Sequence, residues 1–196
     1  MKFTPDHHIQ SVSCLKKHFS QHHFNVFNEL NIYYWIAGGA VRDFFLNEPF
    51  NDIDYYFSDR ALQERVIKYL TTEKKFTIAA SYEHHYTLIN DNIKYDICVP
   101  RCSSPDPHST IYSFDYTVAC CAIDTNLKFY CHDDFFNDII HKKLVRLPQS
   151  DRYVLTTCKR LRRYLDRGYT IDSENLKAVL IDQERTIENR LKRNRS

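Results

Sequence analysis

The sequence predicts an α+β fold, in which a small mixed or antiparallel sheet is packed against helices and followed by a short helical region. Segments with apolar residues at three- and four-residue spacing, typical of amphipathic helices, alternate with short runs rich in β-branched and aromatic residues. With 196 residues and 43% hydrophobic residues, the chain can bury a core of its own. We expect one main domain over residues 1–148 and a short helical region with a basic tail over residues 149–196.

The first half of the chain is expected to alternate helices and strands. Apolar residues between His8 and Leu30 form two groups at helical spacing, which indicates one amphipathic helix or two. A buried strand should end at Gly38-Gly39, and the helix after it should end near Pro49, because proline disfavours helix in the preceding residue. The expected order is a helical segment over 8–30, a strand over 33–37, a helix over 40–47, a strand over 52–57 and a helix over 59–72.

The second half is expected to be richer in strands before it becomes helical. Asp91-Asn92 is typical of a tight hairpin turn between two strands. Gly168 stands where a helix commonly ends. The expected order is strands over 76–80, 85–90 and 93–99, a loop over 101–109, strands over 118–123 and 127–131, and helices over 133–141, 151–167 and from 173 onward.

Composition narrows the classes of function. A formal charge of +2 gives no whole-molecule attraction to nucleic acid, although residues 185–195 are basic, as in either a solvated helix end or an RNA-binding arm. Seven cysteines without a signal peptide or a long apolar run favour a reducing, cytoplasmic location and no membrane partner. Neither the cysteines nor the ten histidines have the spacing of a zinc site, so we expect no metal centre built from them.

Three aspartates stand out as candidate catalytic residues. Side chains two positions apart on a strand point to the same face, so Asp52 and Asp54 should lie side by side. Asp96 interrupts an apolar strand, where aspartate is disfavoured. A structural explanation for Asp96 alone, in which its carboxylate caps a backbone group or pairs with a lysine, stays open. Because Asp96 accompanies an Asp-x-Asp pair, we favour a functional role for Asp96 over the structural explanation.

Carboxylates gathered in one place repel each other unless cations neutralise them, and hard oxygen ligands suit Mg²⁺. Two Mg²⁺ ions, with Mn²⁺ as an alternative, could then support phosphoryl transfer at Asp52, Asp54 and Asp96. Gly38 and Gly39 at a helix start could seat a triphosphate on backbone N–H groups, with Arg42 as a fixed cation. A tight turn without a ligand is the alternative explanation of the glycines.

These residues resemble a known signature. Gly38-Gly39-Ala40-Val41-Arg42-Asp43, followed by Asn51-Asp52-Ile53-Asp54, is similar to the head-domain motif of the class II tRNA nucleotidyltransferases (CCA-adding enzymes) and bacterial poly(A) polymerases. The resemblance extends over residues 20–180 and implies a nucleotidyltransferase-type sheet. It places Asp96 as the third carboxylate, Asp43 in the nucleotide-binding motif and Asp115 at the nucleotide sugar. In the helix that resembles the family's neck, Lys159 and Arg162 could hold phosphates, or could belong to a solvated helix face.

The sequence also departs from the family pattern. Ser113 and Phe114 replace paired arginines, and the base-reading motif falls on Ser150, Asp151 and Val154, of which only the aspartate matches. The usual CCA specificity is therefore not expected. We expect transfer of a nucleoside monophosphate from an NTP to the 3′ hydroxyl of an RNA, with tRNA among the candidates. The alternatives are transfer to a protein or small-molecule hydroxyl, and a non-catalytic nucleotide- or RNA-binding relative. The oligomeric state stays open.

Overall fold

The computed structural model describes residues 5–50, 52–90, 93–101, 105–148 and 154–193. The chain divides into two compact units. We call residues 1–111 and 121–131 the sheet unit, and residues 112–120 and 132–196 the helical unit. The predicted domain boundary after residue 148 adjoins residues 149–153, which lie outside the described residues, and it stays a prediction. No helix among the described residues is long and apolar enough to cross a membrane.

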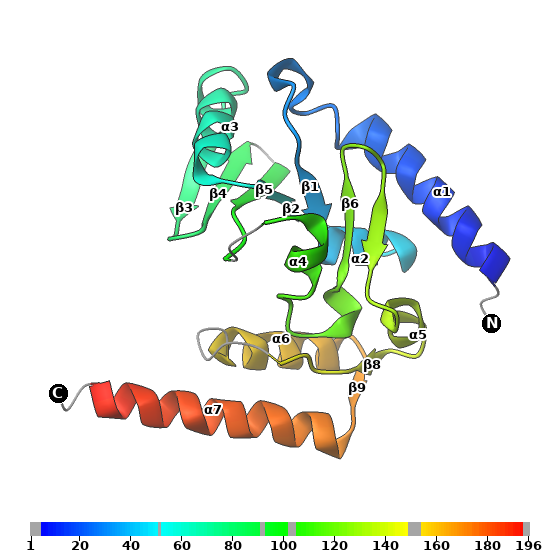
Figure 1. The fold of residues 1–196 in the computed structure, drawn as a ribbon, viewed down its shortest axis with the longest axis vertical. Coiled ribbons are helices and arrows are strands. Elements are labelled where there is room, and N and C mark those ends of the chain that lie inside the picture. The colour runs from blue at the N-terminus through cyan, green and yellow to red at the C-terminus, as the bar shows by residue number, and fades with distance from the viewer. Residues whose placement is uncertain (1–4, 51, 91–92, 102–104, 149–153, 194–196) are drawn as a thin grey trace. The chain divides into compact units, whose positions relative to one another are not determined.

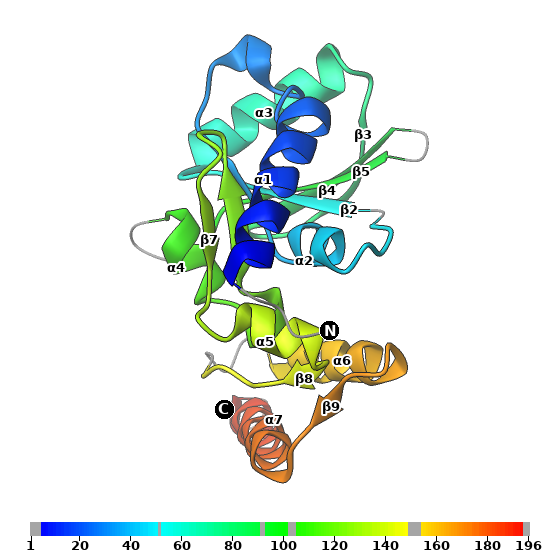
Figure 2. The same ribbon diagram turned by 90° about the vertical axis from the view of Figure 1, so that its right-hand side faces the viewer.

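The sheet unit is built on seven strands in the order β3-β4-β5-β2-β1-β6-β7 (Figure 1). Only β2 and β5 pair in parallel, and the other neighbours are antiparallel. Figure 2 shows β2, β4 and β5 running alongside one another. The strands are β1 (Trp35–Ala37), β2 (Asp52–Tyr56), β3 (Thr77–Ser81), β4 (His85–Asn90), β5 (Ile93–Cys98), β6 (Cys121–Asp124) and β7 (Phe129–Cys131). The helices are α1 (Pro5–His22), the 3-10 turn η1 (Asn28–Leu30), α2 (Gly39–Phe45), α3 (Arg60–Thr72) and α4 (Pro107–Ile111).

The two faces of the central strands differ in polarity. Ile53 and Tyr55 of β2 are buried, together with Tyr95 and Ile97 of β5. This face forms an aromatic core, in which Tyr55 and Tyr95 meet edge to face with ring centroids 5.0 Å apart. On β2 the alternate positions, which include Asp52 and Asp54, are less buried. Burial of the apolar face therefore fixes the direction in which the aspartates point.

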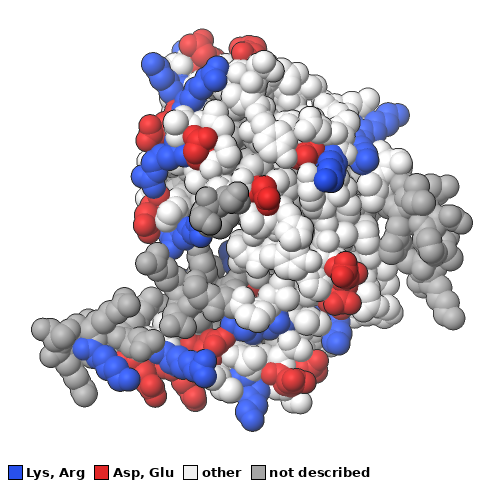
Figure 3. All heavy atoms as spheres, in the orientation of Figure 1, with Lys and Arg blue, Asp and Glu red and all other residues white. Residues whose placement is uncertain are grey.

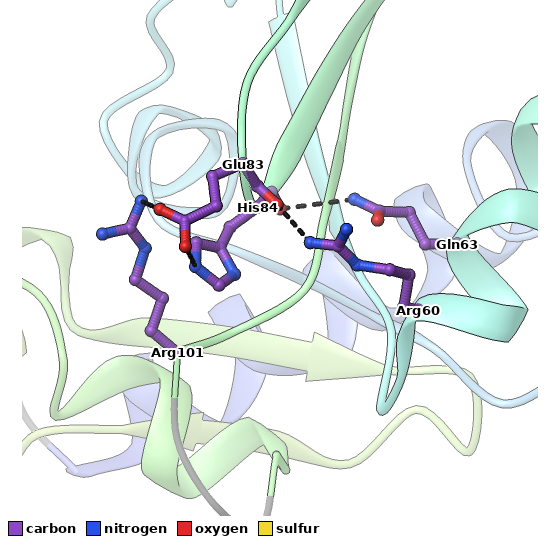
Figure 4. Close-up of polar contacts among 5 residues, drawn as sticks. All are labelled: Arg60, Gln63, Glu83, His84 and Arg101. Carbon is purple, nitrogen blue, oxygen red and sulfur yellow. Dashed lines mark hydrogen bonds and ion pairs between the residues drawn. The ribbon is translucent and has the colours of Figure 1, made fainter.

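The connection between β3 and β4 is held by side chains from neighbouring elements (Figure 4). Arg60 Nη2 at the start of α3 donates to the carbonyl oxygen of Glu83 at 2.5 Å. Gln63 Nε2 donates to the carbonyl oxygens of His84 at 3.3 Å and Ile97 at 2.8 Å. Arg101 Nη2, just after β5, pairs with the Glu83 carboxylate at 3.4 Å. The contacts of Arg60 and Gln63 tie the β3–β4 connection and β5, the strand that carries Asp96, to α3.

The helical unit contains η2 (Thr117–Ala119), α5 (Phe135–Ile140), β8 (Lys143–Leu144), α6 (Val154–Asp166), β9 (Thr170–Ile171) and α7 (Ser173–Arg193). The short strands β8 and β9 pair in parallel. The Thr117 hydroxyl donates to the buried carboxylate of Asp138 at 2.6 Å. Gly168, with φ of 81°, follows α6, and its N–H donates to the Leu165 carbonyl oxygen at 2.9 Å. The predicted C-terminal role of Gly168 is confirmed, because a positive φ favours glycine there.

The predicted α+β fold is confirmed, and most of its elements lie within a few residues of their predicted ranges. The Asp59 side chain caps α3 by accepting from the Leu62 N–H at 2.9 Å. The predicted hairpin joins β4 and β5, and Asn90 pairs with Ile93. Its turn residues, Asp91 and Asn92, lie outside the described residues.

Two predicted elements are wrong in part. The expected loop over 101–109 contains the start of α4, whose first turn is capped by Asp106: the Ser109 N–H donates to Asp106 Oδ1 at 2.6 Å. Proline is well suited to the first helical position, and aspartate is well suited to the position before it. The Asp106-Pro107 sequence is therefore a helix-start signal that the loop prediction missed. The expected strand over 118–123 begins only at Cys121, because residues 117–119 form the 3-10 turn η2. A short apolar run does not distinguish a strand from a buried turn.

Candidate functional site

Asp54 and Asp96 lie directly opposite one another on adjacent strands. The parallel register of β2 and β5 pairs Asp54 with Asp96 and Asp52 with Lys94. Paired residues in a sheet point to the same face, so all four side chains share the less buried face of these strands. On the far side of β5, Thr87 of β4 is paired with Asp96, and its hydroxyl donates to Asp96 Oδ1 at 2.5 Å. The structure therefore brings the three predicted catalytic aspartates together.

Lys94 stands among these carboxylates. Its Nζ lies 3.1 Å from Asp52 Oδ2 and 3.4 Å from Asp96 Oδ2. Although partial burial acts in the opposite direction, hydrogen bonds and charge from Asp52 and Asp96 raise the pKa of Lys94. The side chains of Lys94 and Asp52 are 39% and 56% exposed, whereas that of Asp96 is 14% exposed. One ammonium group thus partly neutralises two of the three carboxylates. We call Asp52, Asp54, Lys94 and Asp96 the carboxylate cluster.

Two further side chains lie on β4 and β5 beside the carboxylate cluster. Burial, together with the charges of Asp54 and Asp96, raises the pKa of the Cys98 thiol well above its ordinary value. Burial also lowers the pKa of His85, against the pull of the negative charge on Asp96. Cys98 is therefore a neutral thiol at neutral pH, and it does not supply a thiolate.

The donor chemistry of the carboxylate cluster suits a hard divalent cation, since Mg²⁺ prefers carboxylate oxygens. The ammonium of Lys94 already stands in for a cation between Asp52 and Asp96. With the side chains in these positions, no group of three acidic, histidine or cysteine side chains within the described ranges is arranged to hold a metal ion. Residues of the right type are thus present on adjoining strands, and Asp52 and Asp96 would have to leave Lys94 to bind a metal. Their role as metal ligands stays a prediction.

The glycine pair lies at the end of β1, next to β2. The antiparallel register pairs Ile36 with Tyr55, so the chain leaves β1 near the level of Asp54. Gly38 has φ of 83° and ψ of −130°, a conformation that essentially requires glycine. Its N–H donates to the Cys121 carbonyl oxygen at 2.9 Å. The turn is therefore a strand-to-helix connection that requires glycine, and it lies beside the carboxylate cluster.

Arg42 lies against this turn, but its guanidinium is buried and already paired. A Cβ atom built on Gly39 would lie 3.8 Å from Arg42 Nη2. Arg42 is 5% exposed, and its Nε pairs with Asp43 Oδ1 at 2.7 Å. Asp43 is itself 7% exposed. Asp43 thus holds the arginine in place beside the glycines, and both residues belong to the packed base of the turn.

The remaining predicted site residues belong to the helical unit. Asp115 is buried, and its Oδ2 accepts from Arg160 Nη1 at 2.8 Å. Lys159 and Arg162 on α6 are exposed. On the face drawn in Figure 3, basic and acidic side chains are intermingled among the described residues. Ser150 and Asp151 lie outside the described residues, whereas Val154 is the first residue of α6.

Sequence reasoning missed Lys94 and Thr87. A signal for both was present, because a hairpin with the two-residue turn predicted from the sequence at Asp91-Asn92 pairs Asn90 with Ile93, and this register also pairs Thr87 with Asp96. The alternation of side chains also places Lys94 on the face of Asp96. A lysine partner is one of the structural explanations that the sequence leaves open for Asp96, and the structure identifies that lysine as Lys94.

Comparison with solved structures shows the fold. The CCA-adding enzyme of Thermotoga maritima complexed with tRNA is 20% identical, with a TM-score of 0.63 over 91% of this chain and 46% of that chain. A CCA-adding enzyme with CTP is 19% identical, with a TM-score of 0.65 over 91% of this chain and 47% of that chain. The same kind of enzyme with ATP has a TM-score of 0.62 at 19% identity, covering 95% of this chain and 44% of that chain. The sheet unit and its helices thus have the nucleotidyltransferase fold of the CCA-adding enzymes, as the resemblance implied.

Sequence comparison points to a family that the motifs did not reveal. The curated protein "Gabija anti-defense 2" of Bacillus phage SPbetaL7 is 28% identical over 156 residues, which is 78% of this chain. The chain spans 38% of the length of that protein. A model of the Gabija anti-defense 2 family matches residues 9–142, a range that includes the glycine turn and the whole carboxylate cluster. The chain therefore belongs to the Gabija anti-defense 2 family.

Proposed function

We propose that this chain is a metal-dependent nucleotidyltransferase that transfers a nucleoside monophosphate from an NTP to the 3′ hydroxyl of an RNA. The observation that carries the proposal is the pairing of Asp54 with Asp96 across β2 and β5, with Asp52 on the same face. A chance grouping of three aspartates on two adjacent strands is disfavoured, because aspartate is depleted from strands. The nucleotidyltransferase fold of the structural neighbours supports the same reaction class.

In this proposal Asp52, Asp54 and Asp96 hold two Mg²⁺ ions, for which Mn²⁺ can substitute. Bound there, such ions would activate the attacking hydroxyl and stabilise the pyrophosphate leaving group. Thr87 holds Asp96 in one orientation through its 2.5 Å hydrogen bond. Asp96, at 14% exposure, is thereby held more firmly than Asp52. Asp52, which is 56% exposed, has more room to adjust than Asp96.

The glycine turn is proposed to receive the triphosphate. The Gly38 N–H already donates to Cys121, so the proposed seat uses the N–H groups that follow it at the start of α2. Such groups have no partner within the helix, and the missing side chains of Gly38 and Gly39 let phosphate oxygens approach them. Arg42 lies beside Gly39 and adds positive charge, and Asp43 keeps its guanidinium in place. Lys159 and Arg162 are proposed to hold phosphates of the nucleotide or of the RNA end. Asp115 would contact the nucleotide sugar only after its carboxylate is released from Arg160.

A protein hydroxyl is the second candidate acceptor, and the family supports it. The name of the curated relative says that it acts against a defence called Gabija, and a modifying enzyme could achieve this by nucleotidylating a protein component. The structural neighbours supply the case for RNA, since one of them is complexed with tRNA and others with CTP or ATP. Both candidates use the same carboxylate cluster, and we place the reaction in the cytoplasm.

The test incubates the purified chain with Mg²⁺ or Mn²⁺, each α-labelled NTP in turn, total RNA and a cell protein extract. Label on RNA supports the first acceptor, and label on protein supports the second. Asp54→Asn combined with Asp96→Asn should lower transfer by at least about a thousandfold, because the proposed ligands lose their charge. Glu29→Gln, in a surface ion pair with Lys74, is the matched control and should leave transfer unchanged. Absence of transfer by the wild-type chain under every condition would refute the proposal.

A further inference from the structure

Lys94 supplies a positive charge to the carboxylate cluster from within the chain. Its Nζ contacts Asp52 Oδ2 and Asp96 Oδ2, one from each of the two strands that carry the aspartates. Lys94 is paired with Asp52 in the β2–β5 register, so its position is set by the backbone of the sheet. The lysine therefore belongs to the cluster and is not a surface side chain that happens to reach it.

The exposure of these groups indicates that the contacts of Lys94 can be exchanged. Lys94 is 39% exposed, and Asp52 is 56% exposed. Ion pairs in such surroundings are weak, because water screens the charges. Asp96 is different, since Thr87 keeps hold of one of its oxygens. Release of Lys94 would thus free Asp52 and one oxygen of Asp96 without unpacking the strand.

We infer that Lys94 is a built-in competitor for the divalent cation: it bridges Asp52 and Asp96 before metal binds and is displaced when metal binds. This inference rests on the proposed function, because it concerns the metal that the carboxylate cluster would hold. A lysine ammonium and a divalent cation cannot occupy the same position between Asp52 and Asp96. Metal affinity is therefore set by the cost of moving Lys94 aside as well as by the three ligands.

Direct binding of Mn²⁺, measured by electron paramagnetic resonance and by calorimetry, tests this inference without relying on activity. Lys94→Gln should bind Mn²⁺ on the order of tenfold more tightly than the wild type, because a positive charge beside the ion is removed. Lys94→Arg keeps the charge and should bind with nearly wild-type affinity. Lys74→Gln is the matched control, since Lys74 is 41% exposed and pairs with Glu29 at 3.2 Å, and it should leave affinity unchanged.

Thermal unfolding provides a second readout. Without metal, Lys94→Gln leaves the carboxylates without their ammonium partner, so its midpoint should be lower than that of the wild type. Saturating Mn²⁺ should raise the midpoint of Lys94→Gln by more than it raises that of the wild type. This readout also shows directly that the variant folds.

The outcomes separate the inference from the proposed function. If the wild type binds Mn²⁺ and Asp54→Asn abolishes binding, but Lys94→Gln binds no more tightly, the competitor role is wrong and the metal site stands. If neither the wild type nor Lys94→Gln binds Mn²⁺ at millimolar concentration, the metal site and the inference are both overturned.

Discussion

Two ion pairs, one in each compact unit, show how differently this chain uses the same chemistry. In the sheet unit, Lys94 bridges Asp52 and Asp96 on a strand face where both the lysine and Asp52 are substantially exposed. In the helical unit, Arg160 pairs with Asp115, whose side chain is only 2% exposed. The first carboxylates can exchange their partner for another cation, whereas Asp115 depends on the arginine that it has. Exposure therefore separates carboxylates that can exchange their partner readily from one that is held more firmly, although all three aspartates were predicted as functional residues.

The largest expected effect on stability comes from breaking the pair whose carboxylate is buried, although Arg160 itself is 38% exposed. Arg160→Gln should lower the free energy of unfolding by about 2–3 kcal/mol, because it leaves the Asp115 carboxylate buried without its partner. Lys94→Gln should lower it by no more than about 1 kcal/mol, since its pairs are screened. Denaturant unfolding of both variants measures the difference. Arg163→Gln, an exposed change on the same helix as Arg160, is the control. Equal losses of unfolding free energy for Arg160→Gln and Lys94→Gln would show that burial of the carboxylate does not distinguish the two contacts.

The second prediction concerns the backbone of the glycine turn, which would hold the sheet-unit site in place if the ion pairs of Lys94 are weak. Gly38→Ala should lower the free energy of unfolding by about 1–3 kcal/mol, because alanine is strained at φ of 83° and ψ of −130°. Gly39→Ala is the control, since its Cβ would meet Arg42 only at an ordinary contact distance of 3.8 Å. If Gly38→Ala is as stable as Gly39→Ala, the backbone is not what holds this region.

His23 is a half-buried ionisable group of a third kind, without an opposite charge to pair with among its described contacts. Burial first, and the nearby charges of His18 and His22 second, lower its pKa to about 4. The unfolded chain has an ordinary histidine pKa of about 6.5. The unfolded state therefore gains the proton first, and stability should fall as the pH drops from about 6.5 toward 4.

Denaturant unfolding at pH 7.5, 6 and 5 measures this effect, and His23→Phe should reduce the slope. His141→Gln, at an exposed position, should keep the wild-type slope. A slope that His23→Phe leaves unchanged would mean that another group causes the pH dependence.

The smallest expected effect is that of salt. The stability difference between the wild type and Lys94→Gln should shrink by a few tenths of a kcal/mol between about 0.1 M and 1 M NaCl, because exposed charges are screened. The difference between the wild type and Arg160→Gln should persist, since Asp115 is buried. Equal salt sensitivity of the two differences would show that the two pairs are screened alike.

The sequence by itself determined most of the elements and the strands that carry the candidate site. Alternation on β2 predicted that Asp52 and Asp54 share a face, and the Asp91-Asn92 turn predicted the hairpin that carries Asp96. These are local patterns, which depend on residues a few positions apart. Local patterns failed where a cap or a short apolar run was ambiguous, as at α4 and η2.

Only the tertiary structure decided which partners the aspartates have. The pairing of β2 with β5 joins residues about forty positions apart and places Lys94 between Asp52 and Asp96. The packing of α6 near η2 likewise gives Asp115 its arginine. Neither contact follows from spacing along the chain, because strand order and burial are properties of the whole packed unit. The sequence named the carboxylates, and the fold determined the cation with which Asp52, Asp96 and Asp115 pair.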